Sequence, residues 1–257
     1  EQGHCEAQYS LGQKYTEDKS RHKDNEQAIF WLKKAALQGH TFASNALGWT
    51  LDRGEAPNYK EAVVWYQIAA ESGMSYAQNN LGWMYRNGNG VAKDYALAFF
   101  WYKQAALQGH SDAQNNLADL YEDGKGVAQN KTLAAFWYLK SAQQGNRHAQ
   151  FQIAWDYNAG EGVDQDYKQA MYWYLKAAQG SVGAYVNIGY MYKHGQGVEK
   201  DYQAAFEWFT KAAECNDATA WYNLAIMYHY GEGRPVDLRQ ALDLYRKVQS
   251  SGTRDVS

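Results

Sequence analysis

The sequence repeats itself with a period close to 36 residues. The stretch 77–109, AQNNLGWMYRNGNGVAKDYALAFFWYKQAALQG, is one copy of a unit that occurs seven times. The alanine that opens each copy recurs at steps of 34 to 36 residues, at Ala7, Ala43, Ala77, Ala113, Ala149, Ala184 and Ala220. A fixed period of this length is characteristic of repeat architectures, in which small units stack and each contacts only its neighbours.

Each unit predicts two helices. In the third copy, Ala77, Leu81 and Met84 fall on one face of a helix, and Ala98 and Trp101 fall on one face of a second helix. The segment 88–94 between them is too rich in glycine to continue a helix. We call the two predicted helices helix A and helix B. A hairpin of this size cannot bury its own apolar faces, so stacking of the units is required.

Capping residues are expected at both ends of helix B. An Asp or Asn precedes it in every unit and can accept a backbone N–H of the first turn. These residues are Asp24, Asn58, Asp94, Asn130, Asp166, Asp201 and Asp237. A residue that tolerates the left-handed conformation is expected to end helix B. These residues are Gly39, Gly73, Gly109, Gly145, Gly180 and Gly252, with Asn216 in the sixth unit.

Small residues predict that helix A and helix B approach closely. A glycine or alanine lies five positions after each opening alanine, and we expect it to face an alanine of helix B. The expected facing alanines are Ala28, Ala62, Ala98, Ala134, Ala170, Ala205 and Ala241. Tryptophans of helix B are then expected to fill the space between neighbouring units, at Trp31, Trp65, Trp101, Trp137, Trp173 and Trp208.

The pattern A-x-x-x-L-G-x-x-Y-x-x-G-x-G-V-x-x-D-x-x-x-A-x-x-W-Y-x-K-A-A-x-x-G resembles the Sel1-like repeat, a relative of the tetratricopeptide repeat with a longer loop. The resemblance covers residues 3–252. It implies an all-α fold, a right-handed α-solenoid of about seven helix-turn-helix repeats. The expected domain is a single solenoid over residues 1–252, with repeats near 3–38, 39–72, 73–108, 109–144, 145–179, 180–215 and 216–252. Residues 253–257 are expected to form a polar tail.

The first residues also carry the repeat pattern. Residues 1–4, EQGH, match the segments LQGH at 37–40 and 107–110, which lie at the end of a helix B. We therefore expect residues 1–4 to be the tail of another helix B. This match favours at least one further repeat upstream in the full-length protein.

The resemblance to tetratricopeptide proteins implies that helix A lines a concave surface, with its ligand-facing side opposite the core stripe. Asparagine offers both a donor and an acceptor to a peptide backbone, and aromatic rings offer rigid apolar area. The expected ligand-binding residues are Asn45, Trp49, Tyr76, Asn79, Asn80, Trp83, Asn115, Asn116, Asp119, Phe151, Trp155, Asn187, Tyr190, Tyr222 and Asn223. The alternative is that the asparagines only satisfy neighbouring groups of the repeat.

Charge on the fourth helix A suggests a kind of partner. Asp112, Asp119, Glu122 and Asp123 would favour a basic segment of a ligand, although they can equally form a solvated face. The net charge of the chain is −3 and charges of both signs are interspersed. This distribution argues against nucleic acid, which usually requires a basic stripe. No apolar run approaches the length needed to span a bilayer.

The sequence predicts a non-enzymatic protein, because it contains no Cys-x-x-Cys motif, phosphate-binding loop or nucleophile elbow. We expect no metal and no cofactor: His194 and His229 lie in adjacent units, but a third ligand is not evident. The predicted function is that of a protein-interaction scaffold, which binds a peptide segment or a protein in the concave groove. The alternatives are a glycan or peptidoglycan binder that uses the groove tryptophans and, third, a hydrolase. The regular repeats suggest a soluble bacterial protein of the cytoplasm or periplasm.

Overall fold

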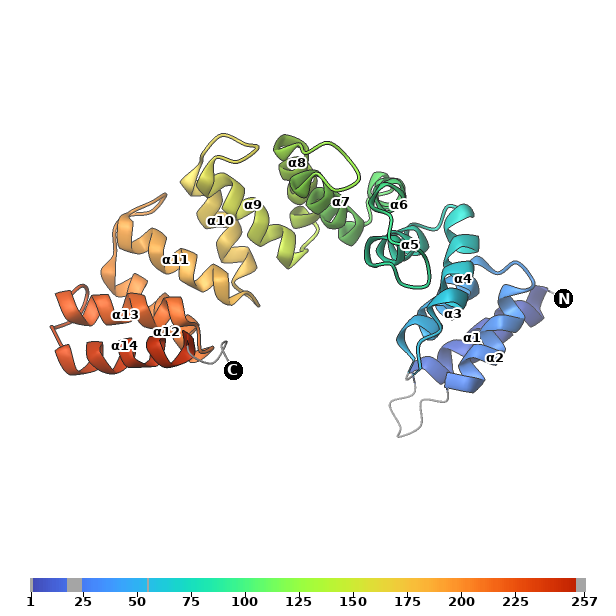
Figure 1. The fold of residues 1–257 in the computed structure, drawn as a ribbon, viewed down its shortest axis with the longest axis horizontal. Helices are drawn as coiled ribbons and strands as arrows, with labels where there is room; N and C mark the ends of the chain where they lie inside the picture. Colours follow the sequence, from blue (N-terminus) through green and yellow to red (C-terminus); the bar gives the residue numbers. More distant parts are fainter. Residues whose placement is uncertain (1, 18–24, 55, 253–257) are drawn as a thin grey trace. The chain divides into compact units, whose positions relative to one another are not determined.

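The computed structural model describes residues 2–17, 25–54 and 56–252, and within these ranges the chain forms fourteen α-helices and no strand (Figure 1). It divides into two compact units, residues 1–130 and residues 131–257. The first unit holds α1 (Gln2–Glu17), α2 (Asn25–Ala36), α3 (Thr41–Arg53), α4 (Tyr59–Glu71), α5 (Ser75–Asn87), α6 (Tyr95–Leu107) and α7 (Ser111–Asp123). The second unit holds α8 (Lys131–Gln143), α9 (Arg147–Ala159), α10 (Tyr167–Ala177), α11 (Val182–His194), α12 (Tyr202–Glu214), α13 (Ala218–Tyr230) and α14 (Leu238–Gly252).

The odd-numbered helices are the predicted helices A and the even-numbered ones are the helices B. In the first unit α1 packs with α2, α3 with α4, and α5 with α6, and each helix B also packs on the next helix A (Figure 1). In the second unit α9, α11 and α13 pair in the same way with α10, α12 and α14. The expectation of an all-α solenoid with about seven repeats is therefore confirmed. The single domain over residues 1–252 stays a prediction.

The caps before helix B were predicted correctly wherever the structure shows their hydrogen bonds. Asp94 accepts the backbone N–H groups of Ala96 and Leu97 at 2.8 and 2.9 Å. Asn58, Asp166, Asp201 and Asp237 each accept an N–H of the first helical turn in the same manner. Asp24 and the tail 253–257 lie outside the described residues.

The left-handed residue after helix B is present in five repeats and absent in the fifth. Gly39, Gly73, Gly109 and Gly145 have φ between 86° and 91°, and Asn216 has φ 61°. Gly180 does not have a left-handed φ, so the expectation for that position is wrong. Helix α10 already ends at Ala177, and a Cβ on Gly180 would lie 2.6 Å from the Arg147 guanidinium. This contact is with the end of a flexible side chain that can move away, so it does not by itself require a glycine at position 180. Gly252 is the last residue of α14.

The core contains tyrosine rings at the place where alanines were expected. A Cβ on Gly82 would lie 2.8 Å from the ring of Tyr102, and Gly48 has the same relation to Tyr66. The small residue of helix A thus makes room for the ring on helix B, which is fully buried. The alanines of helix B are buried as well, but they are not what lies nearest to the glycine. The correction follows from size, because a tyrosine ring requires a neighbour without a side chain.

The tryptophans of helix B are less central than predicted. Trp65 and Trp173 are buried, whereas the other four, Trp31, Trp101, Trp137 and Trp208, are only half-buried. Trp101 packs at the edge of the apolar cluster that contains Leu81 and Met84. The fully buried residue is the next one along helix B, so the main core position lies one residue after the tryptophan.

Glutamine side chains connect neighbouring repeats. Gln78 Nε2 donates to the carbonyl oxygen of Ala70 at 3.2 Å, and Gln108 Nε2 donates to Gln78 Oε1 at 2.8 Å. Gln114 and Gln150 bind a carbonyl oxygen of the preceding helix B with the same geometry. Each buried amide therefore satisfies a helix C-terminus that would otherwise lack donors. Sequence reasoning missed this role, although glutamine follows the opening alanine in four repeats.

The first residues differ from the expected helix B tail. Gln2, Gly3 and His4 belong to α1, and His4 Nδ1 is hydrogen-bonded to Gln8 Nε2 one turn later. Gly3 therefore does not end a helix, unlike Gly39 and its equivalents. Among the described helices none is both long enough and apolar enough to cross a membrane.

Candidate functional site

The predicted ligand-facing side of helix A is exposed in the first unit. Trp49 on α3 and Trp83 on α5 are 42% and 39% exposed, and Tyr76 is exposed beside them. They occupy this side because Leu47 and Leu81 direct the opposite side of the same helices into the core. We call this side the first A-face. It comprises Asn45, Trp49, Tyr76, Asn79, Asn80, Trp83, Asn116 and Asp119.

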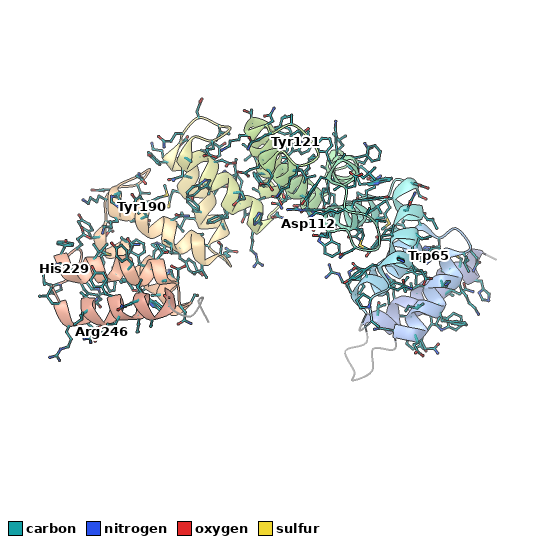
Figure 2. All side chains as sticks on the ribbon, viewed as in Figure 1. Trp65, Asp112, Tyr121, Tyr190, His229 and Arg246 are labelled. Atoms are coloured by element: carbon teal, nitrogen blue, oxygen red, sulfur yellow. The ribbon has the colours of Figure 1, made fainter. Side chains whose placement is uncertain are left out.

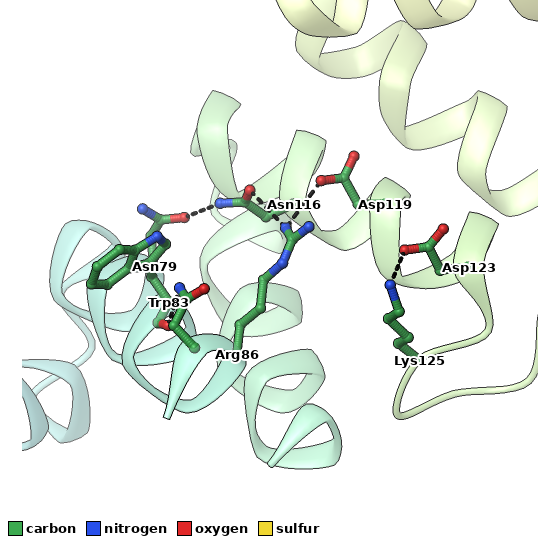
Figure 3. Close-up of polar contacts among 8 residues, drawn as sticks. Asn79, Trp83, Arg86, Asn116, Asp119, Asp123 and Lys125 are labelled. Carbon is green, nitrogen blue, oxygen red and sulfur yellow. Dashed lines mark hydrogen bonds and ion pairs between the residues drawn. The ribbon is translucent and has the colours of Figure 1, made fainter. Parts of the chain in front are cut away.

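The asparagines of the first A-face form hydrogen-bonded pairs between repeats. Asn80 Nδ2 donates to Asn45 Oδ1 at 3.2 Å. Asn116 Nδ2 donates to Asn79 Oδ1 at 3.1 Å, the bond drawn in Figure 3. The asparagines therefore have the alternative, structural role through one amide group in Asn45, Asn79 and Asn80, and through both groups in Asn116, whose Oδ1 atom accepts from Arg86. The Nδ2 groups of Asn45 and Asn79 and the Oδ1 atom of Asn80 are not used in these bonds. They are donors and acceptors of the kind that a peptide backbone requires.

The acidic site on this face is already neutralised. Arg86 Nη1 lies 3.0 Å from Asp119 Oδ2 and 3.5 Å from Asn116 Oδ1 (Figure 3). Asp123 pairs with Lys125 at 2.8 Å on the same helix end. The expectation that the acidic group attracts a basic ligand segment is thus weakened, because two of its four carboxylates have internal cations. Arg86 and Asp119 instead join the third repeat to the fourth.

Asn115 is not part of the exposed face. Its side chain is only 8% exposed, and its Oδ1 atom is buried. It lies next to Asn116 on α7, one helical position closer to the core side. The expectation that Asn115 contacts a ligand is therefore wrong, since a ligand on the surface does not reach a buried amide.

The second unit has an A-face of its own. Trp155 on α9, Tyr190 on α11 and Tyr222 on α13 are exposed, between 44% and 48%. Figure 2 labels Tyr190. Tyr190 stacks on His194 with a centroid distance of 4.1 Å. We call this surface the second A-face. It comprises Trp155, Asn187, Tyr190, Tyr222 and Asn223.

Two predicted residues of the second unit have structural contacts. The Phe151 ring lies 5.6 Å from that of Tyr174, and a Cβ on Gly183 would lie 3.1 Å from it. Phe151 therefore packs between two repeats and is half-buried, so it is a core contact more than a ligand contact. Asn223 Nδ2 donates to the carbonyl oxygen of Thr219 in its own helix at 2.8 Å. Its carbonyl group is the part left for a partner.

Seven consecutive segments of the chain match the family described as Sel1 repeat. The matched segments are 5–40, 41–74, 75–110, 111–146, 147–181, 182–217 and 218–247. Together they account for nearly the whole sequence. The chain belongs to the Sel1 repeat family.

Solved structures of Sel1 repeat proteins have the same fold. One is c5321, a protective antigen of uropathogenic Escherichia coli with an SLR fold, at a TM-score of 0.90 and 35% sequence identity. The match covers 99% of this chain and 55% of c5321, so the chain spans about half the length of that relative. Another is a Sel1 repeat protein from Oxalobacter formigenes, at a TM-score of 0.75 and 34% identity, over 80% of this chain and 84% of that one. Both relatives are bacterial.

Two titratable groups with shifted pKa values, His110 and Asp52, lie at the ends of helices in the Sel1 repeats. His110 precedes α7, and its Nδ1 atom accepts the backbone N–H of Ala113 at 3.3 Å. Burial lowers the pKa of His110 below its ordinary value, although Asp112 acts in the opposite direction. Burial likewise raises the pKa of Asp52, which lies at the end of α3 close to Tyr66. Both groups lie at helix ends that are packed against a neighbouring helix, and burial there is the main cause of their pKa shifts.

The two histidines considered as metal ligands have aromatic neighbours. His194 stacks on Tyr190, and the ring centroids of His229 and Tyr230 lie 4.6 Å apart. In the part of the chain that the structure describes, no three His, Cys, Asp or Glu side chains are grouped so that they could hold a metal ion.

Sequence reasoning missed two sets of exposed rings in the Sel1 repeats. Phe42 precedes the opening alanine of α3, at the same position as Tyr76 on α5, and is more than half exposed. The second set lies on helix B, at the residue before the tryptophan. It comprises Phe30, Phe100, Phe136 and Tyr172. The signal was present, since an aromatic precedes the tryptophan in four of the repeats.

Proposed function

We propose that this Sel1 repeat protein is a non-enzymatic scaffold that binds a peptide segment of a partner protein along an A-face. Sel1 repeat solenoids are typical of protein-interaction scaffolds. The observation that carries the proposal is the pair Trp49 and Trp83. Both rings occupy the same register of neighbouring repeats, and both remain exposed although the fold buries apolar side chains on the other side of each helix.

The chemistry around these rings favours an extended peptide. The Asn45–Asn80 bond leaves the Nδ2 group of Asn45 and the Oδ1 atom of Asn80 unused on the same A-face as the two tryptophans. This donor and this acceptor suit the alternating N–H and C=O groups of a peptide backbone. Rigid aromatic side chains add contact area at low entropic cost, and such residues are enriched among binding hot spots. The Arg86–Asp119 pair reduces the net charge of the face. We therefore expect an apolar or aromatic peptide rather than a strongly basic one.

Exposed tryptophans at regular spacing also suit a glycan, because sugar rings stack on indole faces. An array of synthetic peptides and a panel of soluble oligosaccharides, peptidoglycan fragments included, separates the two classes. Binding is measured by calorimetry and by tryptophan fluorescence. The proposal predicts saturable binding to apolar peptides, lost in Trp49→Ala and Trp83→Ala. Binding to oligosaccharides alone, with the same dependence on the two tryptophans, would replace the peptide with a glycan.

A further inference from the structure

The helix B surface of the second unit carries a repeated pair of an exposed ring and a lysine. On α8 the ammonium group of Lys140 lies 5.6 Å from the ring centroid of Phe136, and on α10 Lys176 lies 5.6 Å from that of Tyr172. The two rings are 47% and 49% exposed. Leu133 and Leu175 add exposed apolar area on the same two helices.

These rings are held rigidly by the fold. Phe136 meets Trp137 edge to face with centroids 5.1 Å apart, and Tyr172 meets Trp173 in the same way at 4.9 Å. Each ring is thus supported by a residue that is at least half-buried, while its outer side faces solvent. A surface that is already ordered loses little conformational entropy when a partner binds. The apolar area is therefore well suited to docking.

The charge of this surface is of one sign. Neither α8 nor α10 contains an Asp or Glu residue. A lysine occurs at the same register on all four helices B of the second unit, namely Lys140, Lys176, Lys211 and Lys247. In the last two repeats an acidic residue, Glu207 or Asp243, takes the place of the exposed ring. Beside it on α14, Arg246 projects from the ribbon and pairs with Asp243 (Figure 2). Within the second unit, α8 and α10 are therefore the helices B that combine an exposed ring and a lysine at these two positions with no acidic residue.

We propose that the α8–α10 surface is a second docking site, separate from the A-faces, for an acidic amphipathic segment of a partner protein. Carboxylates of the segment pair with Lys140 and Lys176, and its apolar side chains cover Phe136 and Tyr172. Each ammonium group lies 5.6 Å from the centroid of its ring, so one short segment can contact the ring with an apolar side chain and the lysine with a carboxylate. The occupant is defined by this complementarity, since an apolar segment without acidic groups would leave both lysines without counter-charges.

An anionic membrane is the competing occupant, and the charges disfavour it. Lipid-binding clusters generally contain about four to eight basic residues. α8 and α10 carry four lysines, and one of them, Lys131, is already paired with Glu161. Asp164 and Asp166 lie in the loop that precedes α10, so a flat anionic bilayer over the surface would approach them as well. A narrow peptide that crosses the C-terminal halves of α8 and α10 avoids these carboxylates.

The test uses the whole chain and two short synthetic peptides labelled with fluorescein. One alternates Glu or Asp with Leu and Phe, and the other has the same apolar residues with Lys in place of the acids. The proposal predicts that the acidic peptide binds, that binding weakens as salt is raised, and that the basic peptide does not bind. The double variant Lys140→Glu, Lys176→Glu is expected to bind the acidic peptide roughly tenfold more weakly.

Lys168→Glu is the matched control, because Lys168 is exposed on α10 but lies outside the lysine row. It is expected to change the affinity by less than about twofold, and circular dichroism verifies that all variants fold. Phe100→Ala on α6, where Gln104 takes the lysine position, should also leave binding unchanged. Equal binding of both peptides, or binding unaffected by the double variant, would overturn the proposal. So would co-sedimentation with phosphatidylserine-containing vesicles in the absence of peptide binding. A-face variants such as Trp83→Ala leave this readout unchanged, so the two proposals fail separately.

Discussion

Gly126, in the loop of the fourth repeat, lies directly against the backbone of Tyr95 at the start of α6 in the third repeat. A Cβ on Gly126 would lie 2.7 Å from the amide nitrogen of Ala96 and closer still to the carbonyl oxygen of Tyr95. Gly126 also has φ +71°, which L side chains rarely adopt. Gly90 and Gly197 repeat this relation with Tyr59 and Tyr167. The second loop glycine is thus a contact between repeats as well as a turn residue.

This contact predicts a difference between two glycine substitutions in the first unit. Gly109→Ala places a Cβ in open space at φ +89°, so only the backbone strain of about 1–2 kcal/mol is expected. Gly126→Ala adds a clash with main chain that cannot rotate away, and we expect a loss of roughly 3 kcal/mol or more. Urea unfolding of the two variants measures the difference. Equal losses of unfolding free energy in the two variants would show that the loop does not pack closely against the start of α6.

The buried ring of helix B predicts a second difference. Tyr102 is fully buried over Gly82, whereas Trp101 is half-buried at the edge of the cluster. Tyr102→Ala is therefore expected to cost about 3–5 kcal/mol, and Trp101→Ala clearly less. Denaturant unfolding gives the free energies, and hydrogen exchange of α5 and α6 locates the damage. A larger loss for Trp101 would restore the tryptophan as the main core residue.

Most of the fold could be read from the sequence, because the period, the apolar stripes and the capping residues are local signals. The opening alanines and Asp94 have the roles that their positions predicted. What failed depends on three-dimensional fit. The partner of Gly82 is a ring one residue beyond the tryptophan, and Gly180 lacks a left-handed φ because α10 already ends at Ala177. Periodicity indicates that a position is buried, but it does not identify the atoms that meet there.

The histidine cap of α7 predicts a dependence of stability on pH. His110 accepts the N–H of Ala113 through Nδ1, which requires the neutral ring, and burial lowers its pKa. The unfolded state therefore binds the proton more readily than the native state. The stability that the His110 cap contributes is complete above about pH 6.5, the ordinary histidine pKa. It is lost as the pH falls through the lower pKa of His110 in the native state.

His110→Asn provides the matched variant, since Asn146 caps α9 in the same way by accepting the N–H of Ala149 at 3.0 Å. We expect the unfolding midpoint of the native chain to fall between pH 7 and pH 5 by more than that of His110→Asn. Thermal or urea unfolding at the two pH values measures this difference. A pH dependence that is the same in both proteins would exclude His110 as its source.

The binding surface was harder to predict than the fold. Helical spacing correctly placed Trp49, Trp83 and Trp155 on the exposed side, because exposure follows from the register opposite the core. It could not show that Asp119 is paired with Arg86, or that Asn115 is buried. Those outcomes depend on side chains of the adjacent repeats and on small shifts in register. The same limit applies to Phe151, whose neighbours come from α10 and α11.

The measurement that tests the scaffold proposal most directly compares folding and binding in Trp83→Ala. The affinity is measured by calorimetry with the best peptide from the array, and stability is measured by urea unfolding. We expect the change in stability to be close to 0.5 kcal/mol, that of a surface substitution, and the loss of binding free energy to reach about 2 kcal/mol or more. Phe100→Ala, an exposed ring on helix B of the same repeat, should affect neither strongly. If Trp83→Ala strongly destabilises the fold while the peptide binds as before, the A-face is not the binding surface.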